Sequence, residues 1–472
     1  MRVLTILFLG LSIFARSQNV IVEEKFEKDN VPLGYYFLVQ KNELVIQKGK
    51  HVGISTNREI HELISFDING NQKILLKNAA VMNPYFSFNE NTFRVVDYAK
   101  MSFTGSTYKI IKDGKASKQF NVDPHYNYLV DDYQFNIENQ KGKTLSAINF
   151  EKDDLYLKIM NFDSYAVKKI KIDKPDISRL IGEDNVKYGK DLNFKVIPKK
   201  ESFELITKSI KSDYKSAIIY RTIYNYEGKK IKELNYKVSI SENYLMYCNN
   251  GGGEIGSNTN GYPVFEDDLN INNFIVDEKT NEVYVYGLIG KKDRRSNFIS
   301  NEPLGYYIFK FSEDGDKIWE SINMISDKKD FNDDQTISLT LARLTIKDNQ
   351  LLFFIGPHII ANKDYMHYSL MDMSNGKLIS SVKLNYKLKS LNTLMTGTRD
   401  FILSFLTNKE ELKNKTLDFE GLMMYNEDNR FKNYINSVNS KNEIDFISTV
   451  TREGTWLIES DNKSYYKVIY FE

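Results

Sequence analysis

Residues 305–323 read GYYIFKFSEDGDKIWESIN, and the fold follows from this stretch and its relatives along the chain. Residues 305–311 alternate in character, as in a strand whose neighbouring side chains face opposite sides of a sheet. The residues Ser-Glu-Asp-Gly at 312–315 interrupt the alternation, which then resumes. Gly315 can adopt the positive φ of a tight turn, and Asp314 can cap that turn through its side chain. The stretch therefore predicts a β-hairpin.

The same arrangement recurs: a β-rich run, a turn of Asp, Asn and Gly, and a second, more polar run. An alternating or apolar run precedes each hairpin, which predicts units of about four strands with the more apolar strands inside. This gradient is typical of a radial sheet that has neighbours on both faces and solvent at its outer strand. The predicted hairpins are residues 62–78, 107–122, 155–173, 217–238, 305–323, 368–384 and 421–438, and the preceding strands are 43–49, 92–98, 144–150, 202–210, 282–290, 351–357 and 401–407.

Seven hairpins and one incomplete unit favour an all-β fold, a β-propeller of eight four-stranded blades. Residues 454–472 supply two strands without an outer strand, and residues 20–26 form a strand without a unit. Pairing the two would let the N-terminal strand complete the last blade and cover two sheet edges. Seven blades are the second choice, and a pair of β-sandwiches or a β-helix are the structural alternatives.

Length and charge limit the classes of partner. A chain of 472 residues is too long for one small core unless the core is a barrel or is built from repeats. Lysine and arginine together number 64 against 63 acidic residues, and loss of Arg2 and Arg16 with a leader would leave 62 against 63. Such a chain has no global field to attract nucleic acid or anionic lipid. Nucleic acid is therefore not an expected partner.

Residues 1–17 predict a signal peptide. Arg2 precedes the apolar run VLTILFLGLSIFA, and Ala15 and Ser17 are small residues at the two positions that a signal peptidase reads. An uncleaved anchor is the alternative, although the run is shorter than the roughly 20 residues of a membrane span. We expect a periplasmic, secreted or surface protein with one propeller domain at 18–472 and no integral span after signal removal.

Residues 249–268, NNGGGEIGSNTNGYPVFEDD, form a Gly-rich stretch that predicts an inter-blade insertion. Three of its glycines match G-x-G-x-x-G, but the following SNTNGYP cannot open the helix that a dinucleotide site needs. No cofactor is expected. Loops of this kind often carry recognition, although a plain solvated loop is the alternative. The candidate ligand-binding residues are Tyr262, Phe265, Glu266, Asp267 and Asp268.

The turn at 311–319 is close to the Asp-box of sialidase-type propellers, S/T-x-D-x-G-x-x-W. Ser312, Asp314 and Trp319 stand at their places, whereas Gly315 is one position early. The box is a structural turn, so this likeness supports blades and not sialidase activity.

Metal and nucleophile chemistry have weak support in the sequence. His358, Asp364 and His367 fall within one predicted loop and contain zinc-type ligands, but plain loop residues are the expected interpretation. The single cysteine, Cys248, cannot form an internal disulfide and has no placed base. No G-x-S-x-G motif is present. We therefore assign no metal site and no catalytic residue.

The abundance of Lys, Asn, Ile, Tyr and Phe, together with the Ser-Gln processing site at 17–18, resembles exported proteins of Bacteroidetes-type bacteria. Within that group the chain resembles secreted β-propeller proteins, and the resemblance is one of architecture without a catalytic motif. It favours an exported, non-catalytic binding or scaffold protein that presents loops to a protein or glycan partner in the cell envelope. The alternative is a polysaccharide- or peptidoglycan-active hydrolase or lyase with its site at the channel mouth.

Overall fold

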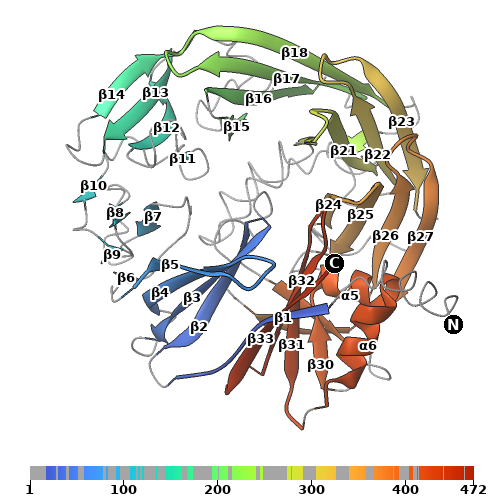
Figure 1. The fold of residues 1–472 in the computed structure, drawn as a ribbon. Helices are drawn as coiled ribbons and strands as arrows, with labels where there is room; N and C mark the ends of the chain where they lie inside the picture. The colour runs from blue at the N-terminus through green and yellow to red at the C-terminus, as the bar shows by residue number, and fades with distance from the viewer. Residues whose placement is uncertain are drawn as a thin grey trace, which may run out of the picture.

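The computed structural model consists mainly of β-strands, most of them antiparallel (Figure 1). The described residues are 18–27, 30–38, 42–51, 58–77, 81–82, 92–95, 107–112, 115–116, 120–121, 134–135, 144–151, 154–161, 167–173, 194–199, 201–210, 215–240, 245–247, 274–277, 279–290, 305–325, 340–357, 365–385, 387–392, 403–407, 412, 414–439, 441–461 and 463–472.

Within these residues, six sheets contain four or five strands each, and neighbouring strands are mostly consecutive in sequence. The first sheet comprises β2 (Val31–Leu38), β3 (Glu43–His51), β4 (Arg58–Phe66), β5 (Gln72–Leu76) and β6 (Val81–Met82). The second comprises β7 (Thr92–Val95), β8 (Thr107–Lys112), β9 (Lys115–Ala116) and β10 (Phe120–Asn121), and the third comprises β11 (Gln134–Phe135), β12 (Thr144–Glu151), β13 (Asp154–Asn161) and β14 (Val167–Lys171).

The fourth to sixth sheets follow the same plan. The fourth comprises β15 (Phe194–Pro198), β16 (Ser202–Ile210), β17 (Ser216–Asn225) and β18 (Lys230–Ser239). The fifth comprises β19 (Leu245–Tyr247), β20 (Phe274–Val276), β21 (Val283–Gly290), β22 (Gly305–Phe311) and β23 (Lys317–Met324), and the sixth comprises β24 (Thr340–Lys347), β25 (Gln350–Pro357), β26 (Tyr365–Asp372) and β27 (Leu378–Asn385).

The seventh sheet is composite and joins the two ends of the chain. Its pairs are antiparallel except for β30 with β31, which run parallel. The strand order is β1 (Gln18–Lys25), β33 (Tyr465–Phe471), β32 (Thr455–Ser460), β31 (Ile444–Val450), β30 (Lys415–Leu417), β29 (Leu403–Thr407) and β28 (Lys387–Asn392).

The sheets stand around a common centre, with strands such as β15 near the centre and β14, β18, β23 and β27 at the outside (Figure 1). This is the radial arrangement of a β-propeller. Apolar side chains fill the spaces between neighbouring sheets, and a further cluster joins the first sheet to the seventh. Between the fifth and sixth sheets, for example, the rings of Tyr306 and Phe353 stack at 4.3 Å.

Six of the predicted hairpins are confirmed by strand pairing. In the hairpin at 305–323, every residue of β22 is buried, whereas β23 alternates between exposed and half-buried side chains. Gly315 adopts a φ of +95° and donates its N–H to the Ser312 carbonyl oxygen at 3.1 Å. The predicted gradient from apolar inner strands to polar outer strands is therefore present.

The glycine of a hairpin turn also lets one sheet approach its neighbour. A Cβ atom at Gly228, whose φ is +82°, would lie 2.4 Å from the Lys171 carbonyl oxygen on β14. Three other turn glycines make the same kind of approach. A Cβ atom placed on Gly70 would lie 3.6 Å from the Ile21 carbonyl oxygen of β1, and one on Gly315 would lie 3.2 Å from the Asn235 carbonyl oxygen of β18. A Cβ atom on Gly376 would lie 2.5 Å from the Trp319 ring of β23. The contact between the first sheet and β1 thus repeats the contact between successive sheets.

The predicted pairing of the N-terminal strand with the end of the chain is confirmed. β1 pairs antiparallel with β33, from Gln18 opposite Phe471 to Lys25 opposite Tyr465. The Glu24 carboxylate on β1 accepts a hydrogen bond from Tyr466 Oη at 2.6 Å and forms an ion pair with Lys48 of β3. β1 therefore contacts both the seventh sheet and the first.

The predicted hairpin at residues 421–438 is wrong. These residues lie in two helices, α5 (Phe419–Glu427) and α6 (Asn429–Ser437), apart from Asp428 between them and Val438 at the end of α6. The helices pack beside the seventh sheet (Figure 1).

Capping and helical spacing explain the two helices. Asp418 accepts a hydrogen bond from the Gly421 N–H at 2.8 Å, and Asp428 accepts from the Arg430 and Phe431 N–H groups. Aspartate in these positions satisfies backbone donors that a helix leaves unpaired. In α6, Phe431 and Ile435 are buried one helical turn apart. The Asp-Asn pair at 428–429, which suggested a hairpin turn, instead begins a helix.

Several sequence predictions lie outside the described residues, among them the signal peptide at 1–17, Cys248 and the Gly-rich stretch at 249–268. The strands that flank this stretch, β19 and β20, both pair with β21, so the chain between them leaves and rejoins the same edge of the fifth sheet. Within the described residues, no helix is long and apolar enough to cross a membrane.

Candidate functional site

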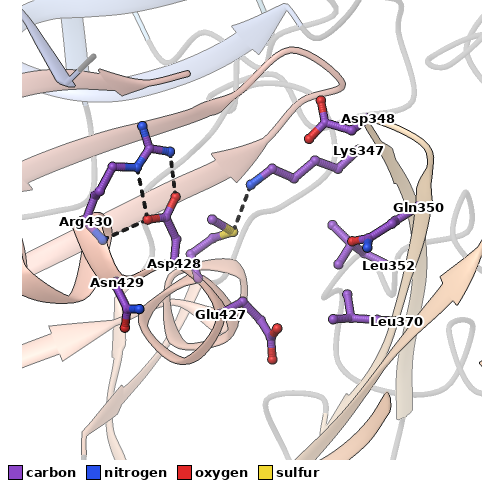
Figure 2. Close-up of a pocket in the computed structure, with 10 residues that line it drawn as sticks. Lys347, Asp348, Gln350, Leu352, Leu370, Glu427, Asp428, Asn429 and Arg430 are labelled. Carbon is purple, nitrogen blue, oxygen red and sulfur yellow. Dashed lines mark hydrogen bonds and ion pairs between the residues drawn. The ribbon is translucent and has the colours of Figure 1, made fainter. Parts of the chain in front are cut away.

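A cleft of about 560 Å³ lies between the sixth sheet and the helix pair α5–α6 (Figure 2). The sheet supplies one wall from β24, β25, β26 and the turn between β24 and β25, and the helices supply the other from the end of α5 and the start of α6. The lining residues are Lys347, Asp348, Gln350, Leu352, Leu370, Met424, Glu427, Asp428, Asn429 and Arg430.

The sheet wall is partly apolar. Leu352 of β25 and Leu370 of β26 are opposite each other in the strand ladder and both line the cleft. Asp348 adopts a φ of +53° in the tight turn that follows β24, and its N–H donates to the Arg452 carbonyl oxygen at 3.2 Å. This bond holds the turn against the seventh sheet, so the cleft mouth has a fixed edge.

Asp428 organises the helix wall because it ends α5 and caps α6. Its carboxylate also accepts from Arg430, with Nη2 at 2.9 Å, while the same Nη2 donates to the Glu472 carbonyl oxygen at 2.6 Å. Burial acts to raise the pKa of Asp428, but Arg430 and the capped N–H groups hold that pKa below its usual value. Asp428 is therefore ionised and committed to the helix junction.

One nitrogen of the Arg430 guanidinium, Nη1 with its two N–H groups, takes part in none of these bonds. Nη1 is buried and has no hydrogen-bond partner within the described part of the chain. Figure 2 shows the guanidinium beside Asp428, with the remaining nitrogen directed away from that carboxylate. A buried donor without an acceptor is unfavourable, and because Nη1 has almost no accessible surface, a ligand in the cleft would reach it only after a local rearrangement.

Two contacts connect the walls across the cleft. Tyr368 of β26 donates its hydroxyl to Glu427 at the end of α5 and accepts from Asn426 Nδ2 at 2.8 Å. Burial, followed by the bond to Glu427, raises the pKa of Tyr368 above its usual value, so the hydroxyl remains a donor. Lys347 extends from β24 toward the helices, with Nζ 3.7 Å from Met424 Sδ (Figure 2).

The cleft combines an apolar wall with a rim that carries both signs of charge. None of its ten lining residues is aromatic, and none is Ser, Thr, Cys or His. Such a lining offers hydrophobic contact, ion pairing and amide hydrogen bonds to a bound molecule.

A buried carboxylate attaches the helix pair to the seventh sheet. Both oxygens of Asp418 accept backbone N–H groups, one from Gly421 at 2.8 Å and one from Ser448 of β31 at 2.8 Å. Nearby, Glu420 Oε2 accepts the Val450 N–H at 2.6 Å. Burial raises the pKa of Asp418 to about 8; the Ser448 and Gly421 N–H groups partly oppose this rise, and the charge of Glu420 adds to it.

This raised pKa predicts a pH-dependent stability. The folded pKa exceeds the unfolded value of about 4, so the folded state binds the extra proton and this group's contribution falls as pH rises toward 8. Between pH 5.5 and 8.5 we expect the wild type to lose about 3 kcal/mol relative to Asp418→Asn, at about 1.4 kcal/mol per pH unit. Urea unfolding of both proteins at the two pH values measures the difference. If the free energy of unfolding changed equally with pH in both proteins, the raised pKa of Asp418 would be contradicted.

A second polar cluster lies where turns of three sheets meet. Arg452 of the seventh sheet forms an ion pair with Asp277 of the fifth, and its carbonyl oxygen accepts the Asp348 N–H of the sixth. Asp277 is 1% exposed, and its Oδ1 also accepts the Lys279 N–H at 2.9 Å. The carboxylate at this junction therefore holds turns together instead of facing a second carboxyl across an open site.

The sequence-predicted ligand residues Tyr262, Phe265, Glu266, Asp267 and Asp268 lie outside the described residues. The same holds for His358 and Asp364 of the metal candidates. His367 is 7% exposed on β26, opposite Ile355, so it is a strand residue and not the predicted loop residue. Where the structure describes the chain, no cluster of three or more His, Cys, Asp or Glu has a metal-binding arrangement.

The Asp-box-like turn forms the predicted hairpin and packs between sheets. The Ser312 hydroxyl accepts the Asp316 N–H at 3.1 Å, and Trp319 Nε1 donates to the Met373 carbonyl oxygen of the sixth sheet at 3.3 Å. These bonds are structural, as expected from the sequence.

No protein-family model matches the chain, and none of the curated proteins searched matches it. Among solved structures, it is similar to the β-propeller domain of the Trilobed protease from Pyrococcus furiosus, with 10% identity, 77% of this chain and 100% of that chain covered, and a TM-score of 0.29. The Dos1 propeller has 8% identity, coverage of 82% and 92%, and a TM-score of 0.34.

Prolyl oligopeptidase B from Galerina marginata is a third similar structure, with 9% identity and a TM-score of 0.33 over 82% of this chain and 48% of that chain. Strand order and sheet placement, and not these low TM-scores, define the fold of the present chain.

Proposed function

We propose that the chain is an exported, non-catalytic binding protein whose β-propeller body holds a peptide segment of a partner protein in the cleft between the sixth sheet and α5–α6. The observation that carries the proposal is the substitution of a helix pair for a predicted outer hairpin, because that substitution builds the cleft wall. Export to the cell envelope is part of the proposal and rests on the predicted signal peptide.

The cleft lining favours a peptide over a glycan. Glycan sites commonly use aromatic faces as platforms, whereas this lining has Leu352, Leu370 and Met424 as its apolar surface. A peptide combines apolar side chains with backbone donors and acceptors, which match a cleft that has three apolar lining residues beside seven polar or charged ones.

The blade number belongs to the same proposal. We count the composite seventh sheet as two units: β31–β32–β33 completed by β1, and β28–β29–β30 completed by the helix pair in place of outer strands. With the six other sheets this makes eight units. The helix pair would then be a specialised unit, and its cleft a recognition surface.

A peptide screen with a cleft-blocking variant tests the function. The purified chain 18–472 is panned against a random heptapeptide library, and the dissociation constant of the best peptide is measured by fluorescence anisotropy. Gln350→Trp places a bulky ring at an exposed lining position and is expected to weaken binding at least about tenfold, the equivalent of 1.4 kcal/mol.

Gln72→Trp is the matched control, because Gln72 is also an exposed residue at the start of a strand but lies outside the cleft lining. It is expected to bind as the wild type does. Equal binding by both variants would place the site elsewhere, and failure of the library to yield a peptide would overturn the proposed function. Turnover of peptidoglycan or polysaccharide by the wild type would support the enzyme alternative instead.

A further inference from the structure

We propose that the helix pair α5–α6, here named the helix lid, is a pH-sensitive device: Asp418 holds the lid closed on the seventh sheet while it is protonated and favours opening when it is ionised. The lid joins β30 to β31, two strands that lie side by side and run parallel (Figure 1). It also forms one wall of the cleft, so its opening would widen the cleft. The consequence for peptide binding rests on the proposed function, whereas the movement of the lid does not.

Two side chains of the lid continue the ladder between β30 and β31. A backbone bond first extends this ladder from the Asp418 N–H to the Phe446 carbonyl oxygen at 3.2 Å. Beyond it, the Asp418 carboxylate accepts the Ser448 N–H at 2.8 Å. The Glu420 carboxylate accepts the Val450 N–H at 2.6 Å. Carboxylate oxygens therefore stand where a neighbouring strand would present carbonyl oxygens, and the lid is attached to β31 through groups whose charge depends on pH.

The two carboxylates share a buried site. Asp418 and Glu420 are each 4% exposed, and both bond to β31. An aspartate that is buried beside a second carboxyl loses the solvation of its charge and meets a like charge, and both effects favour its protonated form. The Ser448 hydroxyl lies nearby, since a Cβ atom on Gly421 would meet Asp418 Oδ1 at 2.7 Å and Ser448 Oγ at 2.8 Å. It offers an acceptor for the proton of a neutral Asp418.

Within the described residues, the charged and titratable groups of the elements around α5 have partners away from Asp418. α5 packs against β29, β30, β31 and α6, and β29 carries no charged residue. On β30 and β31, Lys415 donates to the Ile435 and Asn436 carbonyl oxygens, and Asp445 accepts the Thr416 hydroxyl. On the helices, Arg430 bonds to Asp428, Lys432 lies over the Tyr425 ring, Tyr425 donates to Asn436, Tyr434 donates to Glu459, and Glu427 accepts from Tyr368. The charge that acts on Asp418 is therefore that of Glu420, and no cation offsets it.

Protonation of Asp418 and closure of the lid are therefore linked. Burial raises the pKa of Asp418 to about 8, whereas an aspartate in an open, solvated lid has its usual pKa of about 4. Because the closed lid binds the proton more tightly, the equilibrium constant for closing falls by up to about tenfold per pH unit between about pH 4 and 8. Buried apolar side chains such as Met423 and Ile435 oppose opening at every pH. The open lid is thus a minor state whose population rises with pH.

Thiol labelling of the chain 18–472 measures the opening of the lid. In a Cys248→Ser background, Met423→Cys places a thiol on α5 at a position that is 1% exposed. Its rate of reaction with 4,4′-dithiodipyridine is divided by that of an unstructured cysteine peptide, which removes the pH dependence of the thiol itself. We expect this ratio to rise at least about tenfold between pH 5.5 and 8.5, because Asp418 of the closed lid becomes ionised over this range.

Two controls accompany the measurement. Val283→Cys, at a position that is 0% exposed on β21 of the fifth sheet, reports unfolding of the propeller body and should change less than about threefold. Asp418→Asn keeps a carbonyl oxygen as the helix cap but cannot ionise, so it should reduce the rise at Met423→Cys to less than about threefold. Ile435→Cys on α6, also buried, replaces Met423→Cys if the latter does not fold.

A ratio that stays constant with pH would overturn the proposal. Equal rises at Met423→Cys and Val283→Cys would show unfolding of the whole chain and overturn a separate lid, and a rise that persists in Asp418→Asn would overturn the role of Asp418. No peptide takes part, so the result does not depend on the peptide screen. A lid that opens with pH in a chain that binds no peptide would support the lid and reject only the proposed function.

Discussion

Removal of residues 18–27 is expected to lower the melting temperature by about 10 °C or more. The deletion takes away β1, the whole antiparallel ladder with β33, and the backbone bond from the Phe26 N–H to the Ser464 carbonyl oxygen at 2.8 Å. It also exposes a new strand edge on the seventh sheet, which favours association between chains. Both losses act on the contact between the first and seventh sheets.

A buried charge increases the effect. Lys48 is 7% exposed, and its ammonium pairs with Glu24 of β1, which also accepts the Tyr466 hydroxyl. Without β1 the Lys48 ammonium would lose its counter-ion. Removing one partner of a buried ion pair destabilises a protein more than replacing both partners by apolar residues does. The tilted ring contact between Phe26 and Tyr466 would also be lost.

Thermal unfolding of chains 18–472 and 28–472 measures the change. A synthetic peptide of residues 18–27 added to the shortened chain should recover part of the lost stability, since it can re-form the ladder. Glu23→Gln in the full chain is the control, because this side chain is 63% exposed and its nearest cation, Lys467, is 3.8 Å away. An unchanged melt of the shortened chain would contradict a stabilising role for β1.

Local sequence patterns predicted six of the seven hairpins correctly, and they also predicted the pairing of the two chain ends. Alternation with period two, ended by a turn glycine, is a local signal, and Gly228 and Gly315 adopt the predicted positive φ. The pairing of the N-terminal strand was predicted from a count of strands left without partners, and the structure pairs this strand with β33. The hairpin signals depend on residues close in sequence, and the pairing signal depends on the two ends of the chain.

The helix pair was missed because two local signals compete in the same segment. The residues Asn-Glu-Asp-Asn at 426–429 resemble a hairpin turn, but Asp418 and Asp428 stand ten residues apart as two helix caps. Burial of Phe431 and Ile435 against the sheets decides between them. An aspartate followed by apolar residues at helical spacing was the signal that could have identified α6.

The cleft itself has no local signature. Its walls come from residues 347–370 and residues 424–430, which only the folded chain brings together. Tertiary placement, and not residue type, therefore limits what the sequence predicts about binding surfaces.

Arg221→Met is expected to lower the free energy of unfolding by about 3–5 kcal/mol. Arg221 of β17 and Glu204 of β16 are 4% and 3% exposed, with Nε to Oε2 at 2.8 Å and Nη2 to Oε1 at 2.6 Å. Burial alone would lower the pKa of the Arg221 guanidinium, but the bonds to Glu204 and Tyr236 raise it above its usual value. The substitution leaves a buried carboxylate without its bidentate partner, within the cluster that fills the space beside the fourth sheet.

A double variant distinguishes the orphaned charge from a loss of packing. Glu204→Leu combined with Arg221→Met removes both charges, and we expect it to recover most of the stability that the single substitution loses. Lys317→Met is the exposed control, since its pair with Glu320 has both side chains about half exposed and should change stability by less than about 0.5 kcal/mol. Urea unfolding at neutral pH measures all three. If the double variant were as unstable as Arg221→Met, the loss would come from packing between the sheets, and the ion pair would have no special role.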